Sequence, residues 1–395
     1  MKRLLPSIAA ALLIAACNAS DGAGPTPLPG TDAQLGQATT SWEAMVANAG
    51  PGAMPIKVYS QNVYPGFDID KVEAALGGPP EAALGALTNA LLVFDATNWP
   101  ERAARMALAI SEQHPDVIVL NELVTVRREG FQTVSAFLEG TPFEPFAPYW
   151  AQIPDANVDF LPVFQEELAK RGLHYELVAT LPLTSIRIDL PYFPVPVFVQ
   201  YDDRDAMFVR SDVRVGDVAV DTFAVTLQSV TTQTRGWIAA DLEVHGKPWH
   251  VVGTHPAPDW PTDGRTPQIT ELIGAVAGVT RPVIIAGDLN LLPGSAEYAQ
   301  LATAGFVDLW TLRNGRSPAE FTCCHGDDET LRDPNDGLEK RIDYILARPA
   351  SDYAMGPVTF SIFGDNLSER TATGMWPSDH AGLFAGLVLQ KARAN

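Results

Sequence analysis

Polar side chains that could do acid–base or metal chemistry stand at the ends of several stretches that read as β-strands. In chain order they are Asn62, Glu122, His255, Asp288, Asn290, Asp343, Asp379 and His380. Functional side chains are often carried on loops that a rigid sheet holds in place. Each residue alone is weak evidence, because Asp and Asn at a strand end more often form turns. It is their joint occurrence that indicates a site.

These residue types fit the hydrolysis of a phosphodiester. That reaction needs a base for the attacking water, positive charge for the developing oxyanion and a stabilised leaving group. Magnesium prefers oxygen ligands and needs only one or two carboxylates besides water and the phosphate. Glu122 is the best candidate ligand, with Asn62 beside it. A histidine suits the role of base, because its ordinary pKa lies near neutrality.

The elements that must position these side chains can be read from apolar runs. Val117–Leu120 is wholly apolar, which indicates a strand buried on both faces, and it leads directly into Asn121 and Glu122. Further strands are expected at Ile56–Asn62, Leu190–Val199, Ala206–Arg210, Val218–Leu227, Trp237–Val244, Trp249–Gly253, Val283–Ala286, Arg341–Leu346 and Leu383–Leu389. Helical spacing predicts helices at Trp99–Gln113 and Pro267–Val279, and a Gly/Ala/Pro-rich insertion precedes the first of these. Strands outnumber helices in a mixed order, which fits a β-sandwich flanked by helices.

Six short segments carry a resemblance to a known family. They are Ser60-Gln61-Asn62-Val63, Val119-Leu120-Asn121-Glu122, Gly253-Thr254-His255, Gly287-Asp288-Leu289-Asn290, Arg341-Ile342-Asp343-Tyr344 and Ser378-Asp379-His380. With them the chain resembles the endonuclease/exonuclease/phosphatase superfamily, which includes pancreatic deoxyribonuclease, apurinic endonucleases, bacterial sphingomyelinases and inositol polyphosphate phosphatases. The resemblance implies an α+β fold, a four-layered α/β sandwich in which two mixed β-sheets pack face to face and are flanked by helices.

The same resemblance implies catalytic roles for five residues. His380 would be the general base that activates water, and Asp343 would hydrogen-bond its ring and fix its tautomer. His255 would donate to a phosphate oxygen. Asp288 would align the water or steady the transition state, and Asn290 would contact the phosphate.

Three further residues are assigned to a metal by the resemblance. Glu122 would be a ligand of Mg²⁺, or of its relatives Mn²⁺ or Ca²⁺. Asn62 would support the metal or the phosphate, and Asp379 would bind or orient near the metal. The alternative is a family member that kept the fold and lost turnover. That alternative is disfavoured, because none of the polar residues expected at the site is replaced by an apolar one.

The N-terminus resembles a bacterial lipoprotein signal. Lys2 and Arg3 precede an apolar stretch, Ile8–Ala16, which is too short to span a bilayer and ends at Cys17. The resemblance implies export, acyl chains on Cys17 and anchoring to the outer membrane or cell surface. An ordinary secretory signal with a chance cysteine is the alternative. We therefore expect a signal peptide at 1–16, a flexible tether at 17–54 and a catalytic domain at 55–392.

Charge and composition rank the functions. The formal net charge is -20, with 27 basic against 47 acidic residues. Duplex nucleic acid is bound largely through Lys and Arg. The excess of acidic residues therefore makes a nuclease less favoured but does not exclude it. The first hypothesis is a monomeric phosphodiesterase that acts on a phospholipid headgroup or another small phosphoester. An extracellular nuclease and a non-catalytic surface binding lipoprotein are the alternatives. A serine hydrolase is disfavoured, because the chain has no G-x-S-x-G motif.

Several other residues carry weaker expectations. Cys323 and Cys324 are adjacent and could form a vicinal disulfide or remain two thiols, with an exported setting favouring oxidation. Asp205 could reach the site, but a solvated turn is the favoured interpretation. Trp237 reads as core or sheet packing. Arg341 could contact a phosphate or form a salt bridge to Glu339 or another carboxylate.

Two features of the loops complete the expectations. His325 reads as a loop residue without a role. The aromatic-rich stretch from Thr141 to Phe164 reads as a loop folded over the sheet, with an exposed surface that meets lipid or stacks on bases as the alternative.

Overall fold

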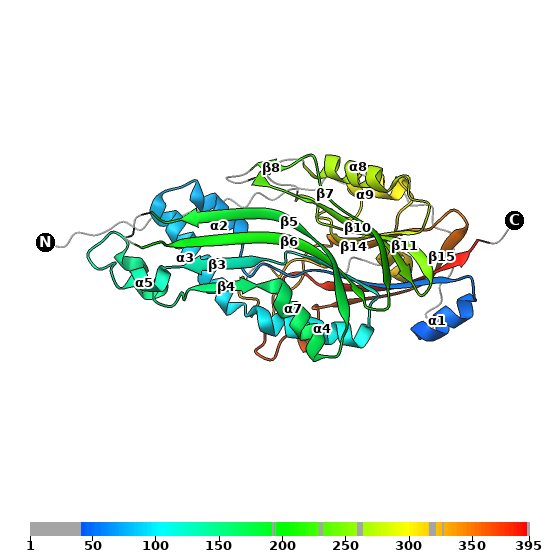
Figure 1. Ribbon diagram of the computed structural model, residues 1–395, viewed down its shortest axis with the longest axis horizontal. Coiled ribbons are helices and arrows are strands. Elements are labelled where there is room, and N and C mark those ends of the chain that lie inside the picture. The colour runs from blue at the N-terminus through cyan, green and yellow to red at the C-terminus, as the bar shows by residue number, and fades with distance from the viewer. Residues whose placement is uncertain are drawn as a thin grey trace. The chain divides into compact units, whose positions relative to one another are not determined.

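Two β-sheets form the centre of the molecule (Figure 1). The computed structural model of the chain describes residues 41–191, 193, 195–228, 232–258, 264–315, 321–325 and 328–392. The predicted signal peptide and residues 17–40 of the predicted tether lie outside these ranges, so the predicted division of the chain stays a prediction.

The larger sheet has the strand order β15-β16-β1-β2-β6-β3-β4, and β5 pairs with β6. Its strands are β1 (Met54–Asn62), β2 (Val117–Asn121), β3 (Thr125–Glu129), β4 (Ala156–Asp159), β5 (Tyr175–Asp189), β6 (Phe198–Arg210), β15 (Tyr353–Phe363) and β16 (Gly382–Lys391). The sheet is mixed, because β1 runs parallel to β2 and antiparallel to β16. This register sets Asn62 beside Asn121 at the end of the parallel pair.

The second sheet has the order β13-β14-β12-β11-β10-β7. Its strands are β7 (Arg214–Thr222), β10 (Gly236–Val244), β11 (Lys247–Thr254), β12 (Val283–Asp288), β13 (Val307–Asp308) and β14 (Asp343–Arg348), and a separate pair is formed by β8 (Leu227–Gln228) and β9 (Thr232–Gln233). It is mixed as well, because β11 and β12 are parallel and the remaining pairings are antiparallel. The pairing of β12 with β14 sets Asp288 opposite Asp343.

The two sheets pack face to face and helices cover their outer faces. One apolar core joins Val58, Val119 and Met207 of the larger sheet to Val251 and Ile284 of the second. The helices are α1 (Trp42–Ala49), α2 (Ile69–Leu76), α3 (Pro80–Ala96), α4 (Trp99–Gln113), α5 (Phe131–Ser135), α6 (Ala147–Trp150), α7 (Phe160–Lys170), α8 (Arg265–Val276), α9 (Ala296–Thr303) and α10 (Leu309–Asn314), with 3₁₀ turns η1 (Glu144–Phe146) and η2 (Leu367–Glu369). The larger sheet is covered by a core that includes α3, α4 and α7, and the second by one that includes α8 and α9. The predicted four-layered sandwich is therefore confirmed.

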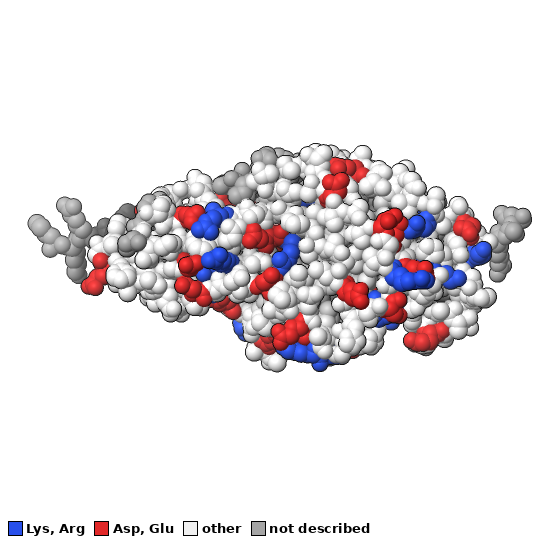
Figure 2. Space-filling view, in the orientation of Figure 1, with Lys and Arg blue, Asp and Glu red and all other residues white. Residues whose placement is uncertain are grey.

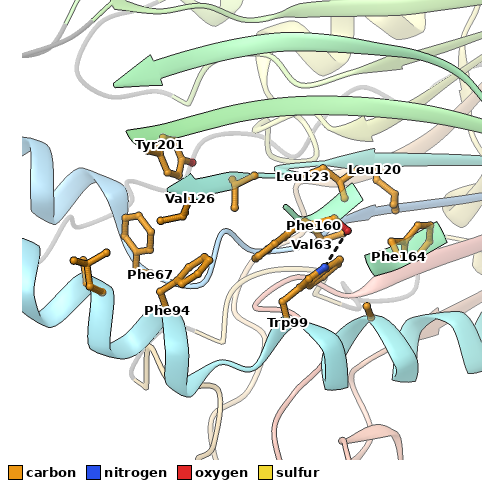
Figure 3. Close-up of a cluster of buried hydrophobic side chains, with 14 of the residues drawn as sticks. Val63, Phe67, Phe94, Trp99, Leu120, Leu123, Val126, Phe160, Phe164 and Tyr201 are labelled. Atoms are coloured by element: carbon orange, nitrogen blue, oxygen red, sulfur yellow. Dashed lines mark hydrogen bonds between the residues drawn. The ribbon is translucent and has the colours of Figure 1, made fainter. Parts of the chain in front are cut away.

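Figure 3 shows how the helical layer attaches to the larger sheet. Trp99 opens α4 with Pro100 beside it in the first turn, where its missing N–H costs nothing. The Trp99 ring stacks on Phe160 with centroids 4.2 Å apart, and its Nε1 donates to the Phe160 carbonyl at 3.0 Å. This pair joins the first turn of α4 to the first residue of α7 beneath β2, the strand that leads into Glu122.

The predicted helix at Trp99–Gln113 and the strands that end at the site residues are confirmed. The Gly/Ala/Pro-rich insertion is not irregular, because its Ala and Leu residues form α2 and α3 and bury an apolar face. The strand predicted at Leu190–Val199 is wrong for most of its length, since β6 begins at Phe198. Helix α1 lies in the described part of the predicted tether. No helix among the described residues is long and apolar enough to cross a membrane.

Candidate active site

The predicted site residues meet where strands of the two sheets end. Asn62 ends β1, Asn121 ends β2, Asp288 ends β12, and Asp343 opens β14. The Asn121 amide links the sheets, because its Oδ1 accepts the backbone N–H of Asp288 at 3.0 Å and its Nδ2 donates to the Thr254 carbonyl at 3.4 Å. Residues far apart in sequence are thus fixed at one edge of the sandwich.

Asp288 is the centre of this arrangement. Its Oδ2 accepts a hydrogen bond from Asn62 Nδ2 at 3.3 Å and lies 3.5 Å from His255 Nε2 and 3.9 Å from His380 Nε2. Its Oδ1 accepts the backbone N–H of Asn290 at 2.9 Å. Burial alone would raise the pKa of this carboxyl, but His380, His255 and the Asn290 N–H together lower it. Asp288 is therefore a permanent anion between two histidines.

His380 and Asp343 form a buried pair. Nδ1 of His380 lies 3.0 Å from Oδ2 and 3.1 Å from Oδ1 of Asp343. Burial alone would lower the pKa of His380, but the carboxylates of Asp343, Asp379 and Asp288 raise it well above its ordinary value. Burial raises the pKa of Asp343 to about 6, against the opposing effect of His380. With Nδ1 occupied by Asp343, Nε2 is the nitrogen that faces the site and can exchange a proton.

The backbone around this pair is held by side-chain hydrogen bonds. The Ser378 hydroxyl accepts the backbone N–H of His380 at 3.1 Å and donates to the Asn62 carbonyl at 2.7 Å. Gln61 Nε2 donates to the His380 carbonyl at 2.9 Å. The Thr322 hydroxyl accepts the backbone N–H of Asp343 at 3.1 Å. The histidine and its partner therefore sit on a rigid frame, as catalytic groups require.

His255 lies on the other side of Asp288 and is neutral. Burial, with Arg235 next, lowers the pKa of His255 to about 4. Arg235 Nη1 lies 2.6 Å from Nδ1 of the ring. Nη1 also lies 3.2 Å from Nε2, which is itself 3.5 Å from Asp288. An arginine can only donate, so its shorter contact, with Nδ1, favours the tautomer of the neutral ring that carries the proton on Nε2. That tautomer is the one that the predicted role of His255 as a donor requires.

Three carboxylates form a second group next to these histidines. Glu122 follows β2 with a left-handed backbone (φ 62°), and Asp203 and Asp205 lie two residues apart on β6 and so share a face. Asp203 and Asp205 are 7% and 2% exposed, and Oδ1 of Asp203 and both carboxylate oxygens of Asp205 have no partner at hydrogen-bond distance. Oδ1 of Asp205 lies 3.9 Å from Nδ1 of His255. Buried carboxylates ordinarily have partners. Burial raises the pKa values of Asp203 and Asp205 and the positive charge of Arg235 already opposes that effect, so a further cation would be favoured beside this group.

The pKa values of these carboxylates agree with that interpretation. Burial, and after it the negative charges of Asp203 and Asp379, raise the pKa of Glu122 to about 8. Burial and Asp203 raise the pKa of Asp205 to about 8. Burial also raises the pKa of Asp379. A bound cation would offset this mutual repulsion and return the carboxyls to their ionised form.

Comparison with known proteins identifies the family. The model of the Endonuclease/Exonuclease/phosphatase family matches residues 89–380. The chain belongs to this family. The matched range includes Glu122, His255, Asp343 and His380, whereas Asn62 precedes it.

No curated protein matches this member of the family. Solved structures similar to it include D. rerio TDP2 complexed with single strand DNA product (18% identity, TM-score 0.48, covering 85% of this chain and 99% of that one). Another is a mannosyl-6-phosphatase of Bacteroides thetaiotaomicron (14% identity, TM-score 0.47, 84% and 99%). A third is an endonuclease/exonuclease/phosphatase of Beutenbergia cavernae (17% identity, TM-score 0.46, 86% and 72%).

Within this family member, the tightest group of metal-ligating atoms is not the predicted one. Ligand atoms of Asp288, Asp343 and His380 lie within 4.8 Å of one another, as do those of Cys323, Cys324 and His380. In the described part of the chain, Glu122 and Asp379 belong to neither group. Magnesium keeps several waters and needs only one or two direct carboxylates, so Glu122 with its neighbours still fits such an ion.

Besides Asp203, four residues that contribute to the site are absent from the predicted set. Asp205 is buried in β6 rather than solvated in a turn, because β6 extends from Phe198 through the whole acidic run. The alternation of Asp203 and Asp205 before the apolar residues 206–209 was the available signal. Asn121 and Arg235 carried no comparable signal, since their partners lie in other strands.

Arg102 of α4 is the fourth missed residue, and it supports the site from behind. It is fully buried, and its guanidinium donates to the carbonyls of Val63, Tyr64 and Pro377 at 2.6, 3.1 and 3.1 Å. Those carbonyls lie just after Asn62 and just before the Ser378-Asp379-His380 segment. Arg102 therefore joins the loop behind the predicted metal residues to the loop behind the catalytic histidine.

Glycine is required at one position of the site. Gly287 precedes Asp288 with φ 148°, and a Cβ there would collide with the Thr254 carbonyl oxygen. Only glycine lets β12 approach the end of β11 closely enough for Asp288 to meet His255. Asn290, with φ 53°, then turns the chain so that its Nδ2 donates to the Pro256 carbonyl at 3.0 Å.

The structure confirms some of the weaker predictions and contradicts others. Arg341 forms a buried ion pair with Asp308 at 2.7 Å, so it is a structural residue. Trp237 packs in the core as predicted. His325 is buried and stacks on Trp376 at 4.2 Å, so it is not a free loop residue. Cys323 and Cys324 are joined as a vicinal disulfide.

The aromatic stretch is mostly internal, as predicted, but it is not a loop, because it contains η1, α6, β4 and the start of α7. Trp150, Phe160 and Phe164 are fully buried, whereas Tyr149 is half-exposed.

Proposed function

We propose that this protein is a divalent-metal-dependent phosphoester hydrolase in which His380 is the general base. The observation that carries the proposal is the convergence on one carboxylate oxygen, Oδ2 of Asp288, of His380, His255 and Asn62 within 3.9 Å. A base, a donor and an anionic aligning group thus surround a single point, next to carboxylates without partners.

Each group then has one task. Nε2 of His380 takes a proton from the attacking water while Nδ1 stays on Asp343, which stabilises the charge that forms on the ring. Asp288, ionised between the histidines, orients that water. His255 donates from Nε2 to a phosphate oxygen, and Arg235 adds a fixed positive charge beside it. Asn290 contacts the phosphate.

A divalent cation would be held on the other side of the site. Glu122 would ligate it directly, with Asn62 and Asp379 supporting it, and Mg²⁺ is the first candidate ahead of Mn²⁺ and Ca²⁺. When bound, the ion supplies Lewis-acid polarisation of the phosphoryl oxygen. Asp203 and Asp205 add negative charge that favours cation binding at this position.

We further propose a phospholipid headgroup or another small phosphodiester as the substrate, cleaved by a monomer that Cys17 anchors at the cell surface. The net charge of -20 supports this choice over nucleic acid. On the face shown in Figure 2, the described Lys and Arg residues are interspersed with Asp and Glu rather than gathered into one basic surface. An extracellular nuclease and a non-catalytic binding lipoprotein are the competing functions.

A hydrolysis panel on the full chain tests the proposal. Bis-p-nitrophenyl phosphate, sphingomyelin and other phospholipids, plasmid DNA and inositol phosphates are each incubated with Mg²⁺, Mn²⁺ or Ca²⁺, with and without chelator. The His380→Ala variant is compared with His174→Ala, which removes an exposed histidine near the start of β2, the strand whose other end leads into the site. Chelator-sensitive turnover that is lost only in His380→Ala supports the proposal. No turnover with any metal would leave the binding lipoprotein, and preference for DNA would leave the nuclease.

A further inference from the structure

A short segment around the cysteine pair lies against the catalytic histidine. The Thr322 carbonyl accepts the backbone N–H of Ala381 at 2.7 Å, and the backbone N–H of His325 donates to the Asp379 carbonyl at 3.0 Å. These two hydrogen bonds stand on either side of His380. The segment 322–325 therefore runs beside 379–381, with Cys323 and Cys324 in its middle.

The same segment also holds the partner of the histidine. The Thr322 hydroxyl accepts the backbone N–H groups of Ile342 and Asp343, each at 3.1 Å. The backbone N–H of Cys323 donates to the Lys340 carbonyl at 2.8 Å. One segment thus contacts the two chain regions that carry His380 and Asp343, although neither is its neighbour in sequence.

The disulfide lies at the point where these contacts meet. Both sulfurs and a ring nitrogen of His380 lie within 4.8 Å of one another. Cys323 is 1% exposed, so its sulfur is packed into the interior, whereas Cys324 is partly exposed. Breaking the bond between the two sulfurs would therefore change their contacts with His380. One of the two sulfurs can be reached from solvent.

We propose that the Cys323–Cys324 disulfide is a positioning element for the His380–Asp343 pair and that its reduction lowers turnover. The inference rests on the proposed hydrolase function. While the bond is intact, the two cysteines keep one arrangement and the segment holds both members of the pair at hydrogen-bond distance. When the bond is broken, the sulfurs must separate to non-bonded contact, and the buried Cys323 can move only against its neighbours, His380 among them.

The reductant is a dithiol. Its thiolate attacks the sulfur of the partly exposed Cys324, the bond between the two cysteine sulfurs breaks, and Cys323 leaves as a thiolate that takes a proton. The second thiol of the reductant then displaces Cys324 from the mixed disulfide. The net change is two electrons and two protons gained by the cysteine pair and a cyclic disulfide formed from the reductant.

The experiment compares the oxidised and reduced forms of the full chain. A Cys17→Ser background leaves Cys323 and Cys324 as the remaining two of the three cysteines. Turnover of bis-p-nitrophenyl phosphate is measured with saturating Mg²⁺ before and after dithiothreitol, with thiol counting to establish the redox state. We expect kcat to fall about tenfold on reduction and to return on reoxidation, because small displacements of catalytic groups are costly. KM should change less than about twofold, since substrate contacts are untouched.

The matched control is Cys323→Ser/Cys324→Ser, which cannot form the bond. It should show the low kcat of the reduced chain and no response to dithiothreitol. Equal kcat in the two redox states would overturn the inference. The inference would also be overturned if dithiothreitol lowered kcat of the double serine variant by the same factor as it lowers kcat of the disulfide-bonded chain. Dithiothreitol would then be acting on the metal.

A second readout separates this inference from the proposed function. Imidazole nitrogen and proton NMR signals of ¹⁵N-labelled protein report the Nδ1 hydrogen bond of His380, assigned with His380→Ala. We expect these signals to shift on reduction, even if no substrate is found. Unchanged signals would overturn the positioning role, whereas shifted signals without turnover in either state would count against the hydrolase proposal alone.

Discussion

The two sides of the site are built in opposite ways. On the histidine side, defined by Asp288, Asp343 and His380, each side chain has a protein partner or an opposite charge close by. On the carboxylate side, defined by Glu122, Asp203 and Asp205, like charges are crowded and buried oxygens lack partners. The first side is organised by the fold alone, whereas a bound cation would stabilise the second. Catalysis and metal binding should therefore be separable by mutation.

The largest effect is expected from His380→Ala. Removing the general base should lower kcat by about 10³-fold, at the upper part of the range for acid–base catalysis. Binding of Mg²⁺ should stay within about threefold of the wild type, because Nε2 of His380 lies 3.9 Å from Asp288 and is not among the proposed metal ligands. Steady-state kinetics and calorimetric metal titration measure the two effects. A large loss of metal affinity would contradict the separation of the sides.

Glu122→Gln should give the converse result. We expect it to weaken Mg²⁺ binding by about 100-fold or more, since a direct carboxylate ligand is lost. At saturating metal, part of the activity should return, unlike in His380→Ala. Titrating turnover against Mg²⁺ concentration distinguishes the two variants. An unchanged metal dependence in Glu122→Gln would show that the ion lies elsewhere.

Asp343→Asn tests how the histidine side is tuned. The Asp343 carboxylate is the first of the groups that raise the pKa of His380, so its loss should lower that pKa. A base works in its unprotonated form, so activity rises as pH increases through the pKa. The acidic limb of the profile of kcat against pH should therefore move to lower pH in the variant, while kcat at the plateau falls about tenfold to 100-fold. A limb that moves to higher pH would contradict the pairing.

The smallest effect is expected from Asp205→Asn and concerns stability. The folded pKa of Asp205, about 8, lies above the unfolded value, so its carboxyl costs stability as pH rises from about 4 to 8. The amide does not ionise, so the metal-free variant should be more stable than wild type at pH 8. The difference should vanish near pH 4 and shrink when Mg²⁺ is added. Urea unfolding at the two pH values measures it, and equal stabilities at pH 8 would remove the evidence for a strained carboxylate side.

The sequence was sufficient for the side chains that follow regular strands. Val117–Leu120 and Val283–Ala286 are short apolar runs, so the polar residues after them had to lie at a sheet edge. It was insufficient where a residue acts through partners in another strand. Asn121, Arg102 and Arg235 become informative only when the fold brings their partners, which are distant in sequence, next to them. The helices α2 and α3 were missed because a Gly-Gly-Pro segment, residues 77–79, separates them and Pro80 and Gly85 lie in α3.

Calorimetric titration of Mg²⁺ into the wild type, Glu122→Gln and His380→Ala tests the central claim most directly. We expect His380→Ala to bind the ion like the wild type, whereas Glu122→Gln should not. The opposite pattern, with binding lost in His380→Ala and kept in Glu122→Gln, would place the metal on the close group of Asp288, Asp343 and His380. In that case His380 would be a ligand and could not be the base.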